Sequence, residues 1–72
     1  MSKDEAIARA KGFAEKQGWA WREPVHAETY RPWFIGALRW RVVSNYGLLG
    51  GNVRVELDDA TGNIMKSQYL PR

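Results

Sequence analysis

The chain carries its clearest structural signal in residues 52–64, which read NVRVELDDATGNI. Odd positions from 53 to 57 are apolar and even positions from 54 to 58 are charged, which is the period of a strand with one buried face. The turn that follows ends in Gly62, at a position that favours a positive φ. We therefore predict an antiparallel hairpin, with one strand from Asn52 to Asp58 and the next from Asn63 to about Tyr69.

Two further strands are expected upstream of this hairpin. One runs from about Phe34 to Asn45, where apolar residues at 38, 40 and 42 share one side of the extended chain. The other runs from about Glu23 to Tyr30, and Pro24 near its start favours an edge position in the sheet. The glycine-rich segment from Tyr46 to Gly51 is expected to be a flexible connection between two of the strands.

The first residues of the chain predict a helix. Ser2 and the glutamate three residues later form the pattern of a capping box, and Gly18 suits the left-handed position that ends a helix. Apolar residues recur at helical spacing at Ile7, Ala10 and Ala14. Since alanines allow close approach, the helix is expected to cover one face of the sheet. The predicted fold is α+β, with one N-terminal helix packed on a four-stranded antiparallel meander in a single domain, residues 1–72.

The composition limits what so short a chain can be. It has 72 residues, a formal net charge of +3 and no cysteine, which excludes disulfide bridges and thiolate metal sites. Four tryptophans, three tyrosines and two phenylalanines are expected to supply much of the core. The sequence has no apolar run of roughly 18 residues that could span a membrane, and no secretory signal is recognised. A cytoplasmic location is therefore expected.

No catalytic set is recognised in the sequence. His26 is the only histidine, and Glu28 lies on the same strand face, where a carboxylate could orient an imidazole. A surface histidine on an edge strand is the favoured interpretation. The hydroxyls that could complete a triad belong to Ser2, Ser44 and Ser67, and none lies in a nucleophile elbow. We therefore expect no enzymatic activity.

Carboxylates cluster near the last turn. Glu56 and Asp58 share a strand face, which could suit a hard cation such as Ca²⁺, but the spacing of a calcium loop is missing. One of Asp58 and Asp59 is expected to cap the turn, and the other to be solvated. The glycines at 47, 50 and 51 lack the Gly-Lys-Ser/Thr and the following helix of a phosphate-binding loop. No metal ion or cofactor is therefore expected.

The middle of the chain holds the excess positive charge, and a partner site is predicted there. Arg39 and Arg41 alternate on one strand face, and Arg54 and Lys66 lie on the outward faces of the next two strands. Such a face could meet an acidic protein or peptide, or RNA where aromatic rings accompany it. A solvated face balanced by acidic residues is the ordinary alternative. With Trp33 as an exposed anchor, the residues predicted to contact a partner are Arg39, Arg41, Arg54 and Trp33.

The pattern of the second half resembles the PepSY-like domains. The resemblance lies in the aromatic-x-Val strand at 40–43, the glycine loop, the alternating strand that ends in Asp-x-x-Thr-Gly at 58–62, and the alanine-rich opening at 5–10. It implies a cystatin-like α+β fold and a non-catalytic binding or inhibitory role, often outside the cytoplasm. A weaker resemblance connects the same ending with immunity proteins of the nuclear-transport-factor-like fold.

These observations predict a small non-enzymatic binding module that acts through protein or peptide contact. One alternative is a protein of the toxin-immunity or peptidase-inhibitor type. The other is a nucleic-acid binder that uses the basic face of the sheet.

Overall fold

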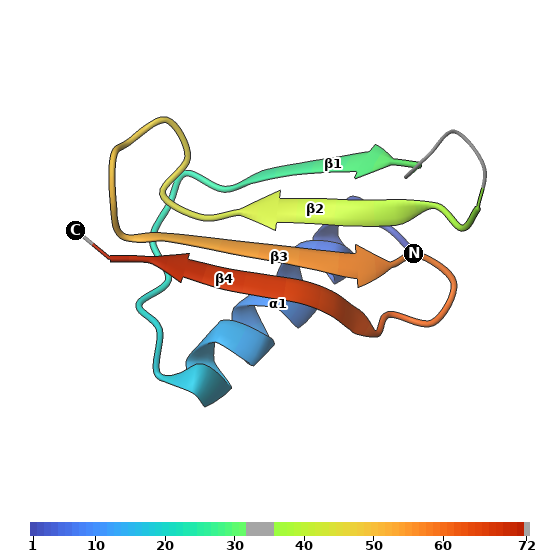
Figure 1. The fold of residues 1–72 in the computed structure, drawn as a ribbon, viewed down its shortest axis with the longest axis horizontal. Helices are drawn as coiled ribbons and strands as arrows, with labels where there is room; N and C mark the ends of the chain where they lie inside the picture. The colour runs from blue at the N-terminus through green and yellow to red at the C-terminus, as the bar shows by residue number, and fades with distance from the viewer. Residues whose placement is uncertain (32–35, 72) are drawn as a thin grey trace.

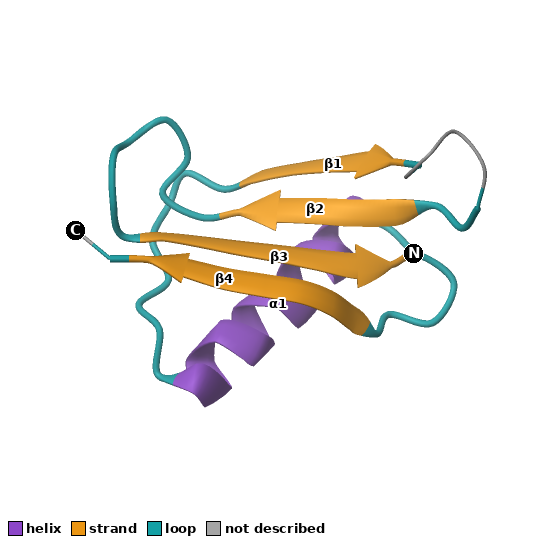
Figure 2. Cartoon of the chain, in the orientation of Figure 1, coloured by secondary structure: helices purple, strands orange, loops and turns teal. Residues whose placement is uncertain are grey.

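The computed structural model describes residues 1–31 and 36–71 and confirms the α+β fold. One helix, α1 (Lys3–Gln17), lies diagonally across one face of a four-stranded antiparallel sheet (Figure 1). The strands follow the chain order β1-β2-β3-β4, so the sheet is a simple meander (Figure 2). Their bounds are β1 His26–Tyr30, β2 Arg39–Val43, β3 Asn52–Asp58 and β4 Ile64–Leu70.

The strand boundaries agree best where the alternation is strongest. β3 has the predicted bounds, and β4 begins and ends one residue later than predicted. β1 begins at His26 and not at Glu23, because the carbonyls of Arg22 and Pro24 accept hydrogen bonds from the loop after β2 and not from a strand. β2 ends at Val43, two residues early, because Asn45 takes a positive φ of 53° and turns the chain.

The core lies between α1 and the two central strands. The helix turns its three buried alanines toward the sheet, and the small side chains let the backbone approach closely. The fully buried apolar residues are Ala6, Ala10, Ala14, Val42, Val53, Val55 and Leu57. At the C-terminal end of the helix, the ring of Trp19 stacks on Tyr69 with centroids 5.8 Å apart and meets Phe13 edge-on at 5.9 Å. These rings extend the core toward β4.

Both ends of α1 are capped. The Ser2 hydroxyl accepts a hydrogen bond from the Glu5 amide at 3.1 Å, as the capping box predicts. The Glu5 carboxylate pairs instead with Arg9, one turn further along, at 3.4 Å. Only half of the predicted capping box is therefore present. Gly18 ends the helix with a φ of 78°. Among the described residues, no helix has the length and apolar character needed to cross a bilayer.

Candidate functional site

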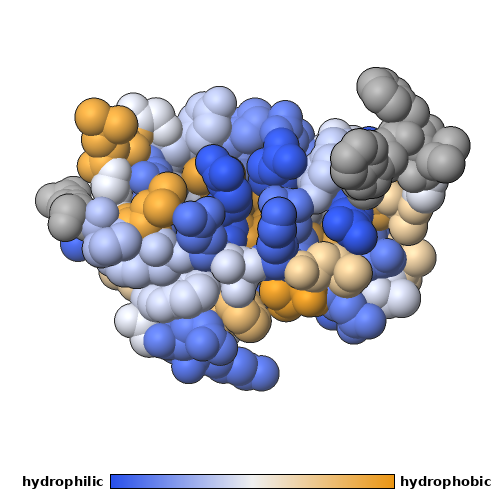
Figure 3. All heavy atoms as spheres, viewed as in Figure 1, coloured by the Kyte–Doolittle hydropathy of each residue, from blue (hydrophilic) through white to orange (hydrophobic). Residues whose placement is uncertain are grey.

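The face of the sheet opposite α1 is uncovered, and the strand register sets its side chains in rows. The central row is formed by Glu28, Arg41, Glu56 and Lys66, each directly opposite its neighbour on the next strand. The row beside it is formed by His26, Val43, Arg54 and Gln68. We call this surface the open face. Figure 3 looks onto it and shows hydrophilic residues gathered over its middle.

Charges of both signs alternate on the open face. The predicted face shared by Arg39, Arg41 and Arg54 is present, and Lys66 lies on it too. However, acidic residues stand between these cations in the register: Arg41 faces a glutamate on both neighbouring strands, and Arg39 faces Asp58. The expected basic stripe is therefore a mixed lattice of charges, because β1 and β3 contribute acids where β2 contributes arginines.

Arg41 is held in place by its neighbours. Its guanidinium lies 4.3 Å from the ring centroid of Tyr30, in cation–π geometry. Its Nη1 atom lies 3.4 Å from Glu28 Oε1, and its Nε atom lies 3.9 Å from Glu56 Oε2. The Tyr30 hydroxyl donates a hydrogen bond to Glu56, and burial together with this carboxylate raises the pKa of Tyr30. The Arg41 guanidinium is therefore engaged by residues of the sheet and stabilises the open face, so it is less available to a partner.

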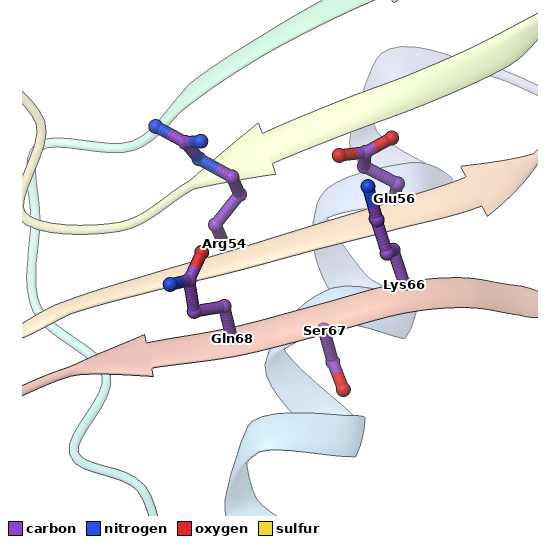
Figure 4. A pocket seen from close by; sticks show the side chains of 5 residues that line it. All are labelled: Arg54, Glu56, Lys66, Ser67 and Gln68. Atoms are coloured by element: carbon purple, nitrogen blue, oxygen red, sulfur yellow. The ribbon is translucent and has the colours of Figure 1, made fainter.

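Arg54 and Lys66 are the exposed cations of the open face. With Glu56 and Gln68 they surround a shallow polar hollow of about 370 Å³ on β3 and β4 (Figure 4). The Ser67 side chain, which also borders it, points away from the other four. Within the described residues, Arg54 lies in no ion pair, so its guanidinium is available to an incoming group. Trp33, the fourth predicted contact residue, lies outside the described residues.

The acidic turn after β3 is tied to the rest of the fold. Asp58 Oδ1 accepts hydrogen bonds from the amides of Ala60 and Thr61, so it caps the turn as predicted. The expectation that Asp59 is solvated is wrong. Its Oδ1 atom accepts from the Trp40 indole at 2.7 Å and from the amine of Met1 at 3.0 Å, and these bonds lower its pKa below the usual 3.8. In the part of the chain that the structure describes, no three candidate ligands come together as a metal site.

His26 is partly exposed on β1 and stacks on the ring of Tyr46, with centroids 4.5 Å apart. Its Nε2 atom lies 3.6 Å from the Glu28 carboxylate, so the predicted acid does stand beside the imidazole. Of the three serines considered for a triad, Ser44 is buried and its hydroxyl accepts from the Val53 amide at 2.9 Å. Ser44 therefore serves the loop after β2.

That loop, residues 44–51, is anchored to the rest of the fold by hydrogen bonds. Asn45 is only 2% exposed and donates from its side-chain amide to the Gly50 carbonyl at 3.0 Å. The side-chain amide of Asn52 donates to the carbonyls of Ser44 and Asn45. The backbone amides of Asn45 and Tyr46 reach across to the segment before β1. Buried polar side chains thus tie the loop to the neighbouring backbone.

The anchored loop presents apolar side chains to water. Leu49 is 99% exposed and Leu48 is 56% exposed. Leu70 joins them, since its carbonyl accepts from the Gly51 amide at 2.7 Å. We call Tyr46, Leu48, Leu49 and Leu70 the apolar tip. Figure 3 shows hydrophobic surface at this end of the molecule. The apolar tip was not predicted from the sequence, although two adjacent leucines among glycines were a visible signal.

The apolar tip and the open face are continuous. Tyr46 of the tip stacks on His26, and His26 begins the row that contains Arg54. Comparison of the chain with models of protein families, with curated proteins and with solved structures finds no match. The site is therefore interpreted from its own geometry.

Proposed function

We propose that this chain is a non-enzymatic, PepSY-like binding module that holds a protein partner against the apolar tip and the adjoining part of the open face. The observation that carries the proposal is the hydrogen-bonded loop that leaves Leu49 fully exposed. Two adjacent leucines exposed to water do not stabilise the free chain, whereas their burial in a partner's pocket would favour association. Burying each leucine in a partner would contribute about 1.5–3 kcal/mol before the costs of association.

Arg54 and Lys66 supply the polar rim of this contact. Both are exposed. Arg54 lies near the start of β3, where the loop of the apolar tip ends, and Lys66 lines the same hollow from β4, so they suit acidic groups at the border of a partner. Rim charges act mainly on the association rate and its salt dependence. Arg39 and Arg41 support the face from β2, and Arg41 does so through Tyr30. Trp33 remains a proposed contact on the predicted pattern alone.

Two features favour a protein partner over a nucleic acid. The alternating glutamates of the open face would repel a phosphate backbone, which needs an uninterrupted positive surface. The apolar tip offers leucines, whereas single-stranded nucleic acid is bound by stacking on aromatic rings. A helix against an antiparallel meander also supports the PepSY-like assignment. An immunity or inhibitor protein would use the same surface for one tight, stoichiometric complex.

The test is site-specific photo-crosslinking in nuclease-treated lysate of the native host. A photoreactive residue at position 49 or 54 should capture the same protein, and one at position 16, exposed near the C-terminal end of the helix, should not. The captured partner is then purified and titrated against the wild type, Leu48→Ser/Leu49→Ser and Lys16→Gln, the last as a control on α1. The double leucine variant should bind at least about tenfold more weakly. Equal binding by all three proteins would refute the proposal, and loss of the crosslink with nuclease would replace it with nucleic-acid binding.

A further inference from the structure

A second hollow, of about 600 Å³, lies on the other side of the molecule, between α1 and the segment that leads into β1. The helix contributes Lys3, Ile7 and Lys11 to it, and the facing segment contributes Trp21, Glu23 and Val25. We call it the helix groove. Ile7, Trp21 and Val25 are partly buried and pack against the core, so the groove has an apolar floor. Its size lies within the range of ordinary ligand sites.

The helix wall of the groove has a regular spacing. Lys3, Ile7 and Lys11 recur every four residues, so they form one ridge along α1. Successive members of this ridge are about 6 Å apart along the helix axis. Side chains on one side of an extended peptide recur at about 6.6 Å. An extended peptide laid along the ridge can therefore match all three positions with three successive side chains from one of its sides.

The charge of the groove indicates which peptide side chains would lie at the two ends of the ridge. Within the described residues, neither Lys3 nor Lys11 has its ammonium group within ion-pair distance of a carboxylate, whereas Arg9 on the same helix is paired with Glu5. Glu23 is the one acid that lines the groove, so the two lysines leave it positive. A bound peptide could therefore pair one carboxylate with the lysine at each end of the ridge and place an apolar side chain over Ile7 between them.

We propose that the helix groove binds an extended peptide segment of the form acidic–x–apolar–x–acidic, with the two carboxylates at Lys3 and Lys11 and the apolar side chain over Ile7. This site goes beyond the proposed function, because it lies on the helix side of the sheet and shares no residue with the apolar tip or the open face. It gives the module a second contact, for a linear segment and not for a folded surface.

The probe is the acetylated, amidated peptide Thr-Asp-Thr-Leu-Thr-Asp-Thr, whose threonines favour an extended chain. It is titrated into the ¹⁵N-labelled full chain. We expect chemical-shift changes at the amides of residues 3–11 and at the indole of Trp21, and no change at Arg54, Gln68 or Leu49. The same peptide with asparagine for both aspartates should bind at least about fivefold more weakly, since it lacks two exposed ion pairs.

Matched variants locate the charges. Lys3→Gln/Lys11→Gln should weaken binding about fivefold, and Lys16→Gln, which removes one positive charge from the same helix outside the groove, should not. Equal affinity of the double variant and the wild type would overturn the proposal, as would equal affinity for the aspartate and asparagine peptides. A second titration uses decanoate, an amphipathic small molecule. If decanoate shifts the groove resonances and the peptide does not, the peptide proposal is overturned in favour of an amphipathic small-molecule ligand. None of these outcomes bears on the apolar tip, whose own resonances report separately.

Discussion

Replacing Gly62 with alanine should destabilise the domain by about 1 kcal/mol, mainly through the backbone. Gly62 has a φ of 75°, and its amide donates to the Asp58 carbonyl at 2.8 Å, which closes the turn between β3 and β4. A left-handed conformation costs a residue with a Cβ roughly 1–2 kcal/mol. The lower entropy of the unfolded alanine chain offsets about 0.4–1 kcal/mol of that cost.

The side chain of Arg9 adds a smaller contribution. A Cβ at position 62 would lie 2.7 Å from Cζ and Nη1 of Arg9, so the guanidinium must move. Arg9 is half exposed and flexible, and its displacement loses at most the exposed pair with Glu5, worth about 0.3–0.5 kcal/mol. Gly62→Asn should cost least, because asparagine tolerates this region, and Gly62→Val should exceed about 2 kcal/mol, because a β-branched residue is a severe outlier there.

Urea denaturation followed by circular dichroism measures these differences in the free energy of unfolding. In a thermal melt, a loss of about 1 kcal/mol of that free energy should lower the melting temperature by about 4–8 °C. Gly12→Ala is the matched control: nothing lies within 4 Å of its added Cβ, and it sits inside α1, so it should stabilise by about 0.8–1 kcal/mol. If Gly62→Ala also stabilises, the strain argument fails. If Arg9→Ala restores the full stability of Gly62→Ala, the cost was a clash and not the positive φ.

Three further predictions follow from contacts between distant parts of the chain. The hydrogen bond from the Trp40 indole lowers the pKa of Asp59. The stability that this carboxylate contributes is therefore present above the unfolded-state pKa of 3.8 and is lost as the pH falls through the lower folded value. At pH values under about 4, the urea concentration at the unfolding midpoint should fall more steeply in the wild type than in Asp59→Asn. Arg41→Gln should lose about 1 kcal/mol in urea melts, since it removes the stack on the tyrosine and two ion pairs, whereas Arg54→Gln should stay within about 0.5 kcal/mol, and equal losses would contradict the roles assigned to them. Asn45→Ala should cost about 2 kcal/mol, because alanine is strained at the positive φ and the buried side-chain amide is lost. Asn45→Gly should cost about half of that, because glycine adopts the positive φ without strain. Equal melting temperatures of the two variants would show that the φ is not strained.

Local pattern was enough to predict the elements of this fold. The alternation of residues 52–58 fixes β3, and the Ser2 cap and the C-terminal Gly18 bound α1, because these signals act between residues a few positions apart. Alternation along β2 and β3 likewise predicted that Arg39, Arg41 and Arg54 share one face, since side chains on a strand point alternately to its two sides. The positive φ of Gly62 was likewise predicted from its turn.

The neighbours of each side chain were decided only by the tertiary structure. Asp59 was expected in water, yet it accepts a hydrogen bond from Trp40, a residue 19 positions away. The Tyr30 hydroxyl meets a carboxylate 26 positions away, and the loop after β2 is fixed by carbonyls of the segment before β1. A sequence determines which face a residue occupies because backbone geometry is local. Strand register and loop docking decide what that residue touches, because these are set by packing over the whole sheet.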